Sequence, residues 1–334
     1  MVFLKSFFIW IYWHPFHRLV RLLPTRAVYL LADFGAAFCY LVFSGRRQRL
    51  FCEVDFLFDE MLTGRKAQQA VRGAFKVLVK NEFEVLLFPK LTDRNIDQYT
   101  ICQGLLHLDR ALDEGKGVIL LFAHFGANQM VMPAMGYRGY RMNQLSAPAT
   151  VWENVMGDRK FSFMERHAMQ RRWAHESSLP VEHINIFGSL RRAVLCLKRN
   201  EILGVAIDGG GGKERMKITF MNKPALFSPG AATLAVRLGC VVLPTFMVRT
   251  KNGPSRMMIF PPIRPPVNVT QKVAIQVITQ AFADQLTKFV REYPDHYLNF
   301  TALRRCMSRF EDHPLFTEKE ESDEFDHPHH PHAA

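Results

Sequence analysis

The sequence lacks the cysteine patterns of disulfide-stabilised and metal-binding folds. Its six cysteines are scattered over 334 residues, without the close pairs that ligate metals and without the dense framework of a small secreted domain. Most of them lie in apolar runs, where cysteine behaves as a small hydrophobic residue. This distribution favours a reducing, cytoplasmic environment for the body of the protein.

The sequence also lacks a nucleic-acid-binding motif, although it is strongly basic. It carries 43 lysines and arginines against 31 acids, a net charge of +12, but no dense basic helix. Residues 311–334 contain eight acids and a single lysine, so residues 1–310 alone carry a net charge of +19. A body this basic predicts an anionic partner. With nucleic acid disfavoured, we expect an anionic membrane or a phosphorylated or acidic substrate.

Acidic residues are missing from the start of the chain, where the first carboxylate is Asp33. Residues 1–26 instead combine aromatic rings with cations, a composition that membrane interfaces favour. Residues 27–44 form an apolar run that is barely long enough to cross a bilayer, and Asp33 near its centre makes a span costly. No small-residue cleavage site follows, which argues against a cleaved signal peptide. We expect residues 1–50 to attach to a membrane, either as an inserted span with the following arginines on the cytoplasmic side or as helices packed on the body.

The length favours one large domain with short appendages. We expect this domain to cover residues 51–310. Residues 311–334 form an acidic, histidine-rich tail whose composition cannot build a core, so we expect disorder there. Its histidines do not predict a specific metal site.

The periodicity of apolar residues, with glycines, prolines and capping residues as boundaries, predicts alternating helices and strands. The expected helices cover residues 67–88, 103–115, 151–173, 189–198 and 269–291. The expected strands cover residues 118–123, 143–147, 181–187, 203–207 and 256–263. This alternation is typical of an α/β fold.

The most informative stretch is residues 117–129. Residues 118–123 are continuously apolar, as in a strand that is buried on both faces. The run ends at His124, and Gly126 allows a tight turn directly after it. Because open α/β sheets bind ligands at the carboxyl ends of strands, and imidazole transfers protons near neutral pH, His124 is a candidate general base. The alternative is a histidine whose hydrogen bonds merely satisfy the end of a strand.

A second apolar strand is followed by Asp208 and then by four glycines, residues 209–212. Such glycines can bring backbone amides close to an anion. Their spacing, however, does not match a phosphate-binding loop or a dinucleotide fingerprint. We therefore interpret the glycines as a plain turn.

Residues 106–120, LHLDRALDEGKGVIL, followed by His124-Phe-Gly, resemble the central motif of the lipid A biosynthesis lauroyl acyltransferase family. This family is a branch of the lysophospholipid acyltransferases. The resemblance continues through residues 218–249 and into a closing motif at residues 293–300. It covers most of the chain, and the family pattern includes an aspartate at the position of Asp208.

The wider family shares a histidine, four intervening residues and a carboxylate. His124 matches the histidine, but Gln129 occupies the carboxylate position. A glutamine carbonyl can orient the ring by a hydrogen bond, but it offers no negative charge to the imidazolium that forms in catalysis. We expect His124 to be the base, Gln129 to orient it, and Asp208 to be a further member of the catalytic site.

The resemblance implies a mixed, largely parallel central sheet flanked by helices, similar to glycerol-phosphate acyltransferases. Within residues 218–249 it implies a loop, a helix over residues 231–238 and a strand that ends at Arg249. The candidate contacts for substrate phosphates or for an acidic donor are Arg249, Arg171, Arg172 and Lys213. For the basic stretch over residues 151–173, a solvated surface is the alternative interpretation.

The activity that the resemblance implies is acyl transfer at the cytoplasmic face of the cell inner membrane. His124 would deprotonate a hydroxyl of a lipid or glycolipid acceptor, with a lipid A-like precursor as the leading candidate. The hydroxyl oxygen would attack the thioester of an acyl carrier protein or coenzyme A donor. No metal or redox cofactor is expected.

Two alternatives remain open from the sequence. Because of Gln129, the chain could be a catalytically impaired homologue that binds lipid or a partner. It could also acylate a different acceptor, such as a phosphatidylinositol mannoside or an ornithine lipid.

Overall fold

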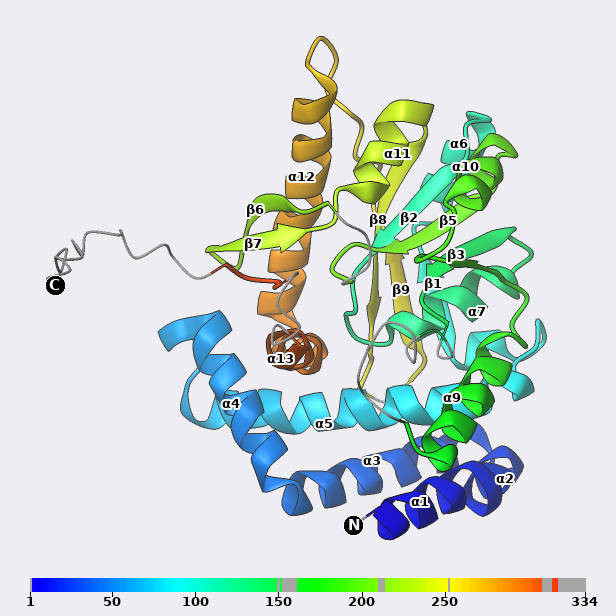
Figure 1. Cartoon of the computed structure of the whole chain (residues 1–334), viewed down its shortest axis with the longest axis vertical. Helices are drawn as coiled ribbons and strands as arrows, with labels where there is room; N and C mark the ends of the chain where they lie inside the picture. Colours follow the sequence, from blue (N-terminus) through cyan, green and yellow to red (C-terminus); the bar gives the residue numbers. More distant parts are fainter. Residues whose placement is uncertain are drawn as a thin grey trace, which may run out of the picture.

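The computed structural model describes residues 2–148, 151, 161–209, 214–251, 253–307 and 314–317. The main strands are β1 (Thr100–Gln103), β2 (Val118–Phe122), β3 (Met142–Ser146), β4 (Glu182–Asn185), β5 (Ile202–Ala206), β8 (Val241–Val248) and β9 (Ser255–Ile259). They form one seven-stranded sheet in the order β1-β9-β8-β2-β5-β3-β4 (Figure 1). Neighbouring strands are parallel except for the antiparallel pair β8–β9. The structure confirms a mixed, largely parallel sheet.

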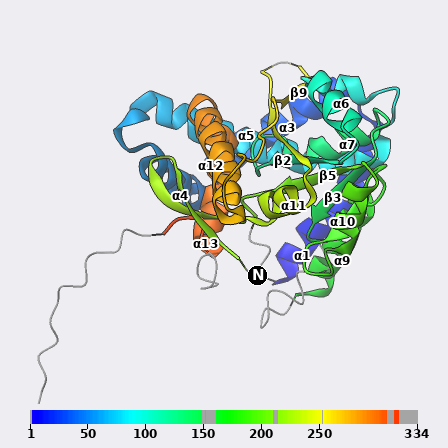
Figure 2. The same ribbon diagram turned by 90° about the horizontal axis from the view of Figure 1, so that it is seen from above.

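Helices cover both faces of this sheet, as the view from above shows (Figure 2). One face carries α6 (Leu105–Asp113) and α7 (Val131–Gly136), and the other carries α10 (Arg191–Lys198), α11 (Gly230–Leu238) and α12 (Gln271–Glu292). Every residue of β2 is buried. Ile119 and Leu121 belong to one core, whereas Leu120 and Phe122 belong to the other. Burial on both faces explains why the sequence of this strand is continuously apolar.

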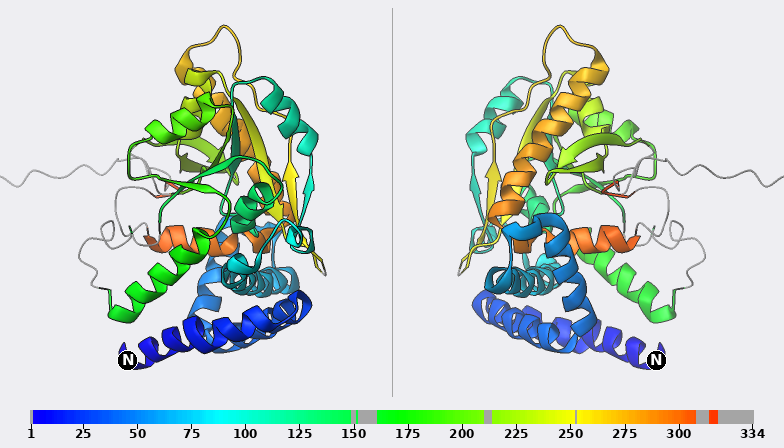
Figure 3. Two further views of the ribbon diagram at one scale, coloured as in Figure 1. Left: turned by 90° about the vertical axis from the view of Figure 1, so that its right-hand side faces the viewer. Right: turned by 90° about the vertical axis from the view of Figure 1, so that its left-hand side faces the viewer.

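A long helix, α5 (Gly64–Leu87), runs past the ends of the strands and contributes to both cores. Below it lies an N-terminal layer (Figures 1 and 3). This layer consists of α1 (Val2–Ile11), the π-helical turn η1 (Tyr12–Phe16), α2 (His17–Leu22) and α3 (Thr25–Val42). The helix α4 (Ser44–Phe58) leads from the layer to the start of α5. Among the described residues, α3 is the one helix long and apolar enough to cross a membrane, with a mean hydropathy of 1.3.

A β-hairpin replaces the loop expected at the start of residues 218–249. Its strands are β6 (Met216–Phe220) and β7 (Lys223–Phe227), and they pair in antiparallel fashion. Residues 314–317 lie beside β7, since Ala225 forms a bridge with Phe316. This short segment is ordered although it falls within the predicted tail, and the rest of the tail lies outside the described residues.

The remaining differences from the sequence predictions concern the ends of elements and additional elements such as β1 and α13. The helix expected over residues 103–115 begins later, as α6, because residues 100–103 pair with β9 and Gly104 adopts a φ of +81°. The described part of the predicted helix over residues 151–173 is α9 (Phe163–Glu176), which a capping box at Ser162 and Glu165 begins. The chain then closes with η7 (Pro294–His296) and α13 (Leu298–Met307).

Candidate active site

His124 and Asp208 meet at the carboxyl ends of two adjacent parallel strands. In the register of β2 and β5, Phe122 lies opposite Ala206, so the residues that follow these strands emerge side by side. The backbone N–H of His124 donates to Asp208 Oδ2 over 2.8 Å, and the ring Nδ1 lies 2.7 Å from Asp208 Oδ1. The Asp208 side chain is fully buried, whereas that of His124 is 39% exposed. A buried carboxylate therefore holds an imidazole that substrate can reach.

This contact selects the chemistry of the His124 ring. Because the Asp208 carboxylate is an acceptor, the ring proton lies on Nδ1, and Nε2 keeps a lone pair that can accept a proton. The negative charge of Asp208 stabilises the imidazolium that forms when Nε2 takes that proton. The pair has the geometry of a general base and its orienting carboxylate.

The closing segment of the chain supports this pair from two sides. The Tyr297 hydroxyl donates to Asp208 Oδ2 over 2.9 Å. Burial, with the adjacent Asp208 carboxylate, raises the pKa of Tyr297 well above its ordinary value, so the phenol stays protonated and remains a donor. The Phe300 ring stacks on the His124 ring at 4.4 Å with an interplanar angle of 1°. In the sequence, the closing motif is only part of the family resemblance, and no role was predicted for Tyr297 or Phe300.

The loop after His124 is fixed by backbone contacts from three elements. Gly126 N–H donates to His296 O over 3.0 Å, Ala127 N–H donates to Met247 O over 3.2 Å, and Asn81 Nδ2 donates to Gly126 O over 3.0 Å. Gly126 has a φ of +61°, and a Cβ there would lie 2.1 Å from Met247 O. The tight turn predicted at this glycine is therefore required by both its conformation and its packing.

Gln129 does not make the hydrogen bond that we expected to orient the ring. Asp208 occupies Nδ1 of His124 instead. The Gln129 Oε1 atom is buried and has no hydrogen-bonding partner among the described residues. The tether comes from a residue 84 positions away along the chain, and a catalytic contribution of Gln129 stays a prediction.

Arg249 is enclosed in an ion pair and is not an exposed phosphate ligand. Its guanidinium donates to both oxygens of Glu84 on α5, over 2.9 and 2.7 Å, and also to Asn81. The Arg249 and Glu84 side chains are only 8% and 1% exposed. Tyr29 donates to the same carboxylate over 2.8 Å. Because its charge is neutralised inside the protein, Arg249 does not fit the substrate contact that the sequence predicted.

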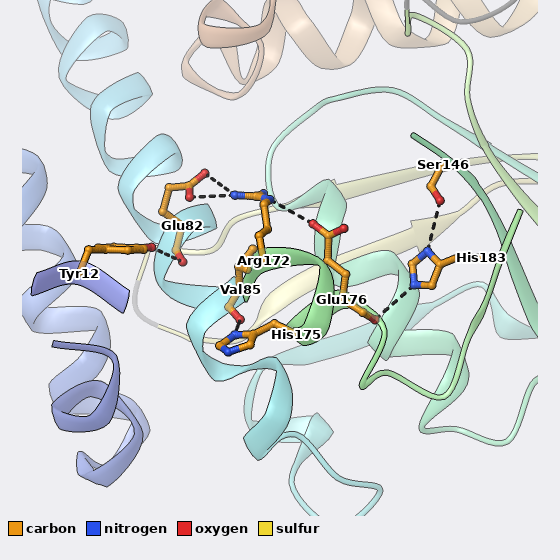
Figure 4. A network of polar contacts seen from close by, with 8 residues as sticks. All are labelled: Tyr12, Glu82, Val85, Ser146, Arg172, His175, Glu176 and His183. Atoms are coloured by element: carbon orange, nitrogen blue, oxygen red, sulfur yellow. Dashed lines mark hydrogen bonds and ion pairs between the residues drawn. The ribbon is translucent and has the colours of Figure 1, made fainter. Parts of the chain in front are cut away.

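Arg172 is likewise held in ion pairs within the protein (Figure 4). It donates to both carboxylate oxygens of Glu82 on α5, over 2.9 and 3.2 Å, and to Glu176 of its own helix over 3.1 Å. Tyr12 of the N-terminal layer donates to the Glu82 carbonyl over 3.1 Å. This network ties α9 and the layer to α5, so Arg172 has a structural role, and a contact of Arg172 with substrate stays a prediction.

The remaining two predicted substrate contacts are Arg171 and Lys213. Arg171 lies near His17 of α2 and near His167 and His175 of its own helix, where its charge lowers the pKa of each imidazole. Lys213 lies outside the described residues. Within the described part of the chain, no group of three or more His, Cys, Asp or Glu side chains could hold a metal ion. The contact between His124 and Asp208 is an arrangement suited to proton transfer.

Comparison with known proteins agrees with this geometry. A family model described as bacterial lipid A biosynthesis acyltransferase matches residues 1–305. A search of curated proteins found no significant match. The family match covers the strand ends, the His124–Asp208 pair and the closing segment that supports it. The chain belongs to the bacterial lipid A biosynthesis acyltransferase family and is an acyltransferase that acts on lipid A-like substrates.

Proposed function

We propose that this protein transfers a fatty acyl chain from an acyl carrier protein or coenzyme A thioester to a hydroxyl of a lipid A-like precursor at the cytoplasmic face of the inner membrane. The observation that carries the proposal is the contact of 2.7 Å between His124 Nδ1 and Asp208 Oδ1, in a chain that matches the family over residues 1–305.

His124 acts as the general base in this reaction. Its Nε2 takes the proton of the acceptor hydroxyl while the hydroxyl oxygen attacks the thioester carbonyl carbon. The tetrahedral intermediate collapses, the carbon–sulfur bond breaks, and the proton on Nε2 passes to the leaving thiolate. The products are an ester and a free thiol, and the base returns to its starting state. Asp208 holds the ring and compensates its transient positive charge.

The membrane proposal is supported by the outer surface of the N-terminal layer. Exposed aromatic side chains on α1 include Phe3, at 86%, and Phe8, at 60%. On α3, Phe34 and Phe38 are 74% and 64% exposed, although they are large and apolar. Such a patch marks an interaction with lipid or with another protein, and its aromatic and cationic composition favours the membrane interface.

We propose that α3 lies along the membrane surface and does not cross the bilayer. Its Val28, Ala32 and Ala36 are buried, spaced four residues apart along the face that packs on α5. Asp33 pairs with Lys80 of α5 over 3.1 Å. A helix held along its length by the body cannot also span a bilayer, and an ion pair at its centre would be costly in hydrocarbon. This packing favours the second of the two arrangements left open by the sequence.

The alternative that the chain is a catalytically impaired homologue is weakened by the geometry of this site. It rested on Gln129, which cannot supply a charge to His124. Asp208 supplies that charge from the neighbouring strand, so the glutamine does not by itself argue against catalysis.

Acyl transfer measured with matched histidine variants tests the proposal. His124→Ala should abolish ester formation with either donor, because the variant lacks the proposed base. His107→Ala, on α6, removes an imidazole outside the site and should keep wild-type turnover. Lipid mass spectrometry of a deletion strain complemented with each variant identifies the acceptor. Wild-type turnover in His124→Ala would overturn the assignment.

A further inference from the structure

Basic side chains from the N-terminal layer and from α9 meet in one interface, which we call the basic seam. It consists of His14, His17, Arg18 and Arg21 on one side and His167, Arg171 and His175 on the other. The three α9 residues are four positions apart, so they lie on one face of the helix. Part of the opposite side is η1, a π-helical turn, and such turns occur frequently at functional sites.

Ring contacts hold the two sides of the basic seam together. His14 stacks on His167 with 5.1 Å between ring centroids and an interplanar angle of 14°. The His17 and His175 rings lie 4.7 Å apart. His175 is anchored in turn, because its Nδ1 lies 2.8 Å from the Val85 carbonyl oxygen of α5 (Figure 4). The histidines of the seam are therefore part of the packed structure, whereas Arg18 and Arg21 are exposed at its edge.

Several polar atoms of the basic seam are buried without a partner. They are Nε2 of His17, Nε2 of His167 and Nε of Arg171, none of which has a hydrogen-bonding partner among the described residues. His17 is only 4% exposed. Buried polar atoms are almost always hydrogen-bonded, because an unpaired one loses its contact with water and gains nothing in return. Arg171 Nε is a donor, and each neutral imidazole donates from Nε2 in one of its two tautomers. The three atoms on facing elements can therefore all donate to a ligand that accepts hydrogen bonds.

The charge of the basic seam points to the same kind of ligand. Burial, followed by His175, Arg171, Arg21 and Arg18, lowers the pKa of His17 to about 4. These four neighbours are all basic residues. The protein therefore keeps the His17 imidazole neutral while the arginines around it remain positive.

Two further histidines of the seam, His167 and His175, are affected in the same way. Burial, then His14 and Arg171, lowers the pKa of His167. Burial, with Arg171 and Arg21, also lowers the pKa of His175, and its contact with the Val85 carbonyl opposes this only in part. The nearby acids are already paired, since Glu165 binds Lys5 and Glu176 binds Arg172.

We propose that the basic seam binds the phosphate of an anionic phospholipid headgroup. Phosphate oxygens accept hydrogen bonds from guanidinium and imidazole N–H groups and neutralise their charge. The seam is built partly from the layer that we place at the membrane, so this inference rests on the proposed membrane attachment. On α2, Leu19 and Leu22 are 50% and 83% exposed beside Arg18 and Arg21, which leaves apolar surface for the acyl chains of the same lipid.

Vesicle flotation of the full-length protein tests the site. Vesicles of phosphatidylcholine alone are compared with vesicles that also contain phosphatidylglycerol. Wild type should bind the anionic vesicles at least about tenfold more tightly. The seam variant Arg21→Gln/Arg171→Gln should lose at least about tenfold more of this preference than the control Arg26→Gln/Arg49→Gln. The control removes the same charge from exposed positions on α3 and α4, so it measures the non-specific electrostatic contribution.

A second measurement follows the ligand at the seam itself. In protein with labelled histidines, short-chain phosphatidylglycerol should raise the pKa of His17 from about 4, because a bound anion stabilises the imidazolium. Short-chain phosphatidylcholine and inorganic phosphate at equal ionic strength should not. A response to inorganic phosphate would assign the seam to the free ion and overturn the lipid proposal.

The remaining outcomes separate this inference from the proposed function. Equal losses in the seam and control variants would overturn the seam and leave membrane attachment intact. An unchanged vesicle preference with a raised KM for the phosphorylated acceptor would also overturn it, since the seam would then belong to the acceptor. If wild type floats with neither vesicle, membrane attachment and the inference both fail, while acyl transfer in detergent still reports on His124.

Discussion

At the scale of single residues, the site depends on which side chain holds His124. Asp208 accepts hydrogen bonds from the backbone and, through Nδ1, from the ring of His124, and Tyr297 adds a third. A fully buried carboxylate is stable only when such donors surround it. Gln129 is close in sequence but makes no such contact. The charge that the sequence motif lacks is therefore supplied from the neighbouring strand.

Asp208→Asn should lower kcat by a factor on the order of 10⁴, the loss known for an orienting aspartate beside a general-base histidine. The amide can present N–H to Nδ1 and favour the wrong tautomer, and it carries no charge. Gln129→Ala should lower kcat much less, because the ring keeps its tether. Steady-state acyl transfer measures both, with Asp55→Asn on the exposed side of α4 as control. A larger loss in Gln129→Ala than in Asp208→Asn would restore the glutamine as the orienting group.

At the scale of elements, the buried pair of Arg249 and Glu84 joins the end of β8 to α5. Asn81, one turn before Glu84, also reaches the Gly126 carbonyl in the loop after His124. The same contacts thus connect helix, strand and catalytic loop. We expect damage here to reduce both stability and the order of the site.

Glu84→Gln should destabilise the protein by about 3–5 kcal/mol, because the Arg249 charge stays buried after its partner is removed. The matched control is Glu114→Gln, which breaks the ion pair with Arg264 at side-chain exposures of 31% and 58%. An exposed pair contributes less than about 1 kcal/mol. Denaturant unfolding compares the two variants with wild type. Equal midpoints for Glu84→Gln and Glu114→Gln would refute a structural role for the buried pair.

At the scale of the whole molecule, the loop that follows His124 contacts α5 through Asn81, and the N-terminal layer lies beyond α5 (Figures 1 and 3). An acceptor drawn from a membrane below the layer would approach this side. The opposite ends of the strands lie farther from the layer. The arrangement is consistent with one substrate that comes from the bilayer and another that comes from solution.

Phe34→Ser/Phe38→Ser should release the full-length protein from membranes. Each phenyl ring withdrawn from an apolar environment costs roughly 1.5–3 kcal/mol, and the effects at the two exposed positions should add. The control Ile101→Ser/Leu106→Ser changes side chains of similar exposure, 50% and 57%, on β1 and α6. Membrane fractionation measures the result. Release of the intact wild type by high salt alone would mean that charge, and not the apolar face of α3, holds the protein.

The sequence by itself determined the parts that depend on neighbouring residues. The continuous apolar run before His124 predicts a strand buried on both faces, and β2 has that character. Gly126 predicts a tight turn, and its positive φ confirms it. The helix that ends at Gly239 follows from the same local rule, since that glycine has a φ of +68°. The sequence predicts polar residues at the ends of two buried strands, and His124 and Asp208 do follow β2 and β5 at one edge of the sheet.

Only the tertiary structure decided which of these polar residues meet. His124 and Asp208 come together because β2 and β5 are adjacent in the sheet. The local sequence of neither strand predicts that the two are neighbours. From the sequence, Arg249 is expected to be an exposed cation that can bind a phosphate. In the fold, α5 packs so that Glu84 pairs with Arg249, and both side chains are buried. The sequence shows each side chain's chemistry, whereas burial and partnership depend on segments far apart in the chain. For that reason His124 and Asp208 could both be predicted as members of the site, but the contact by which Asp208 orients the ring was found only in the folded protein.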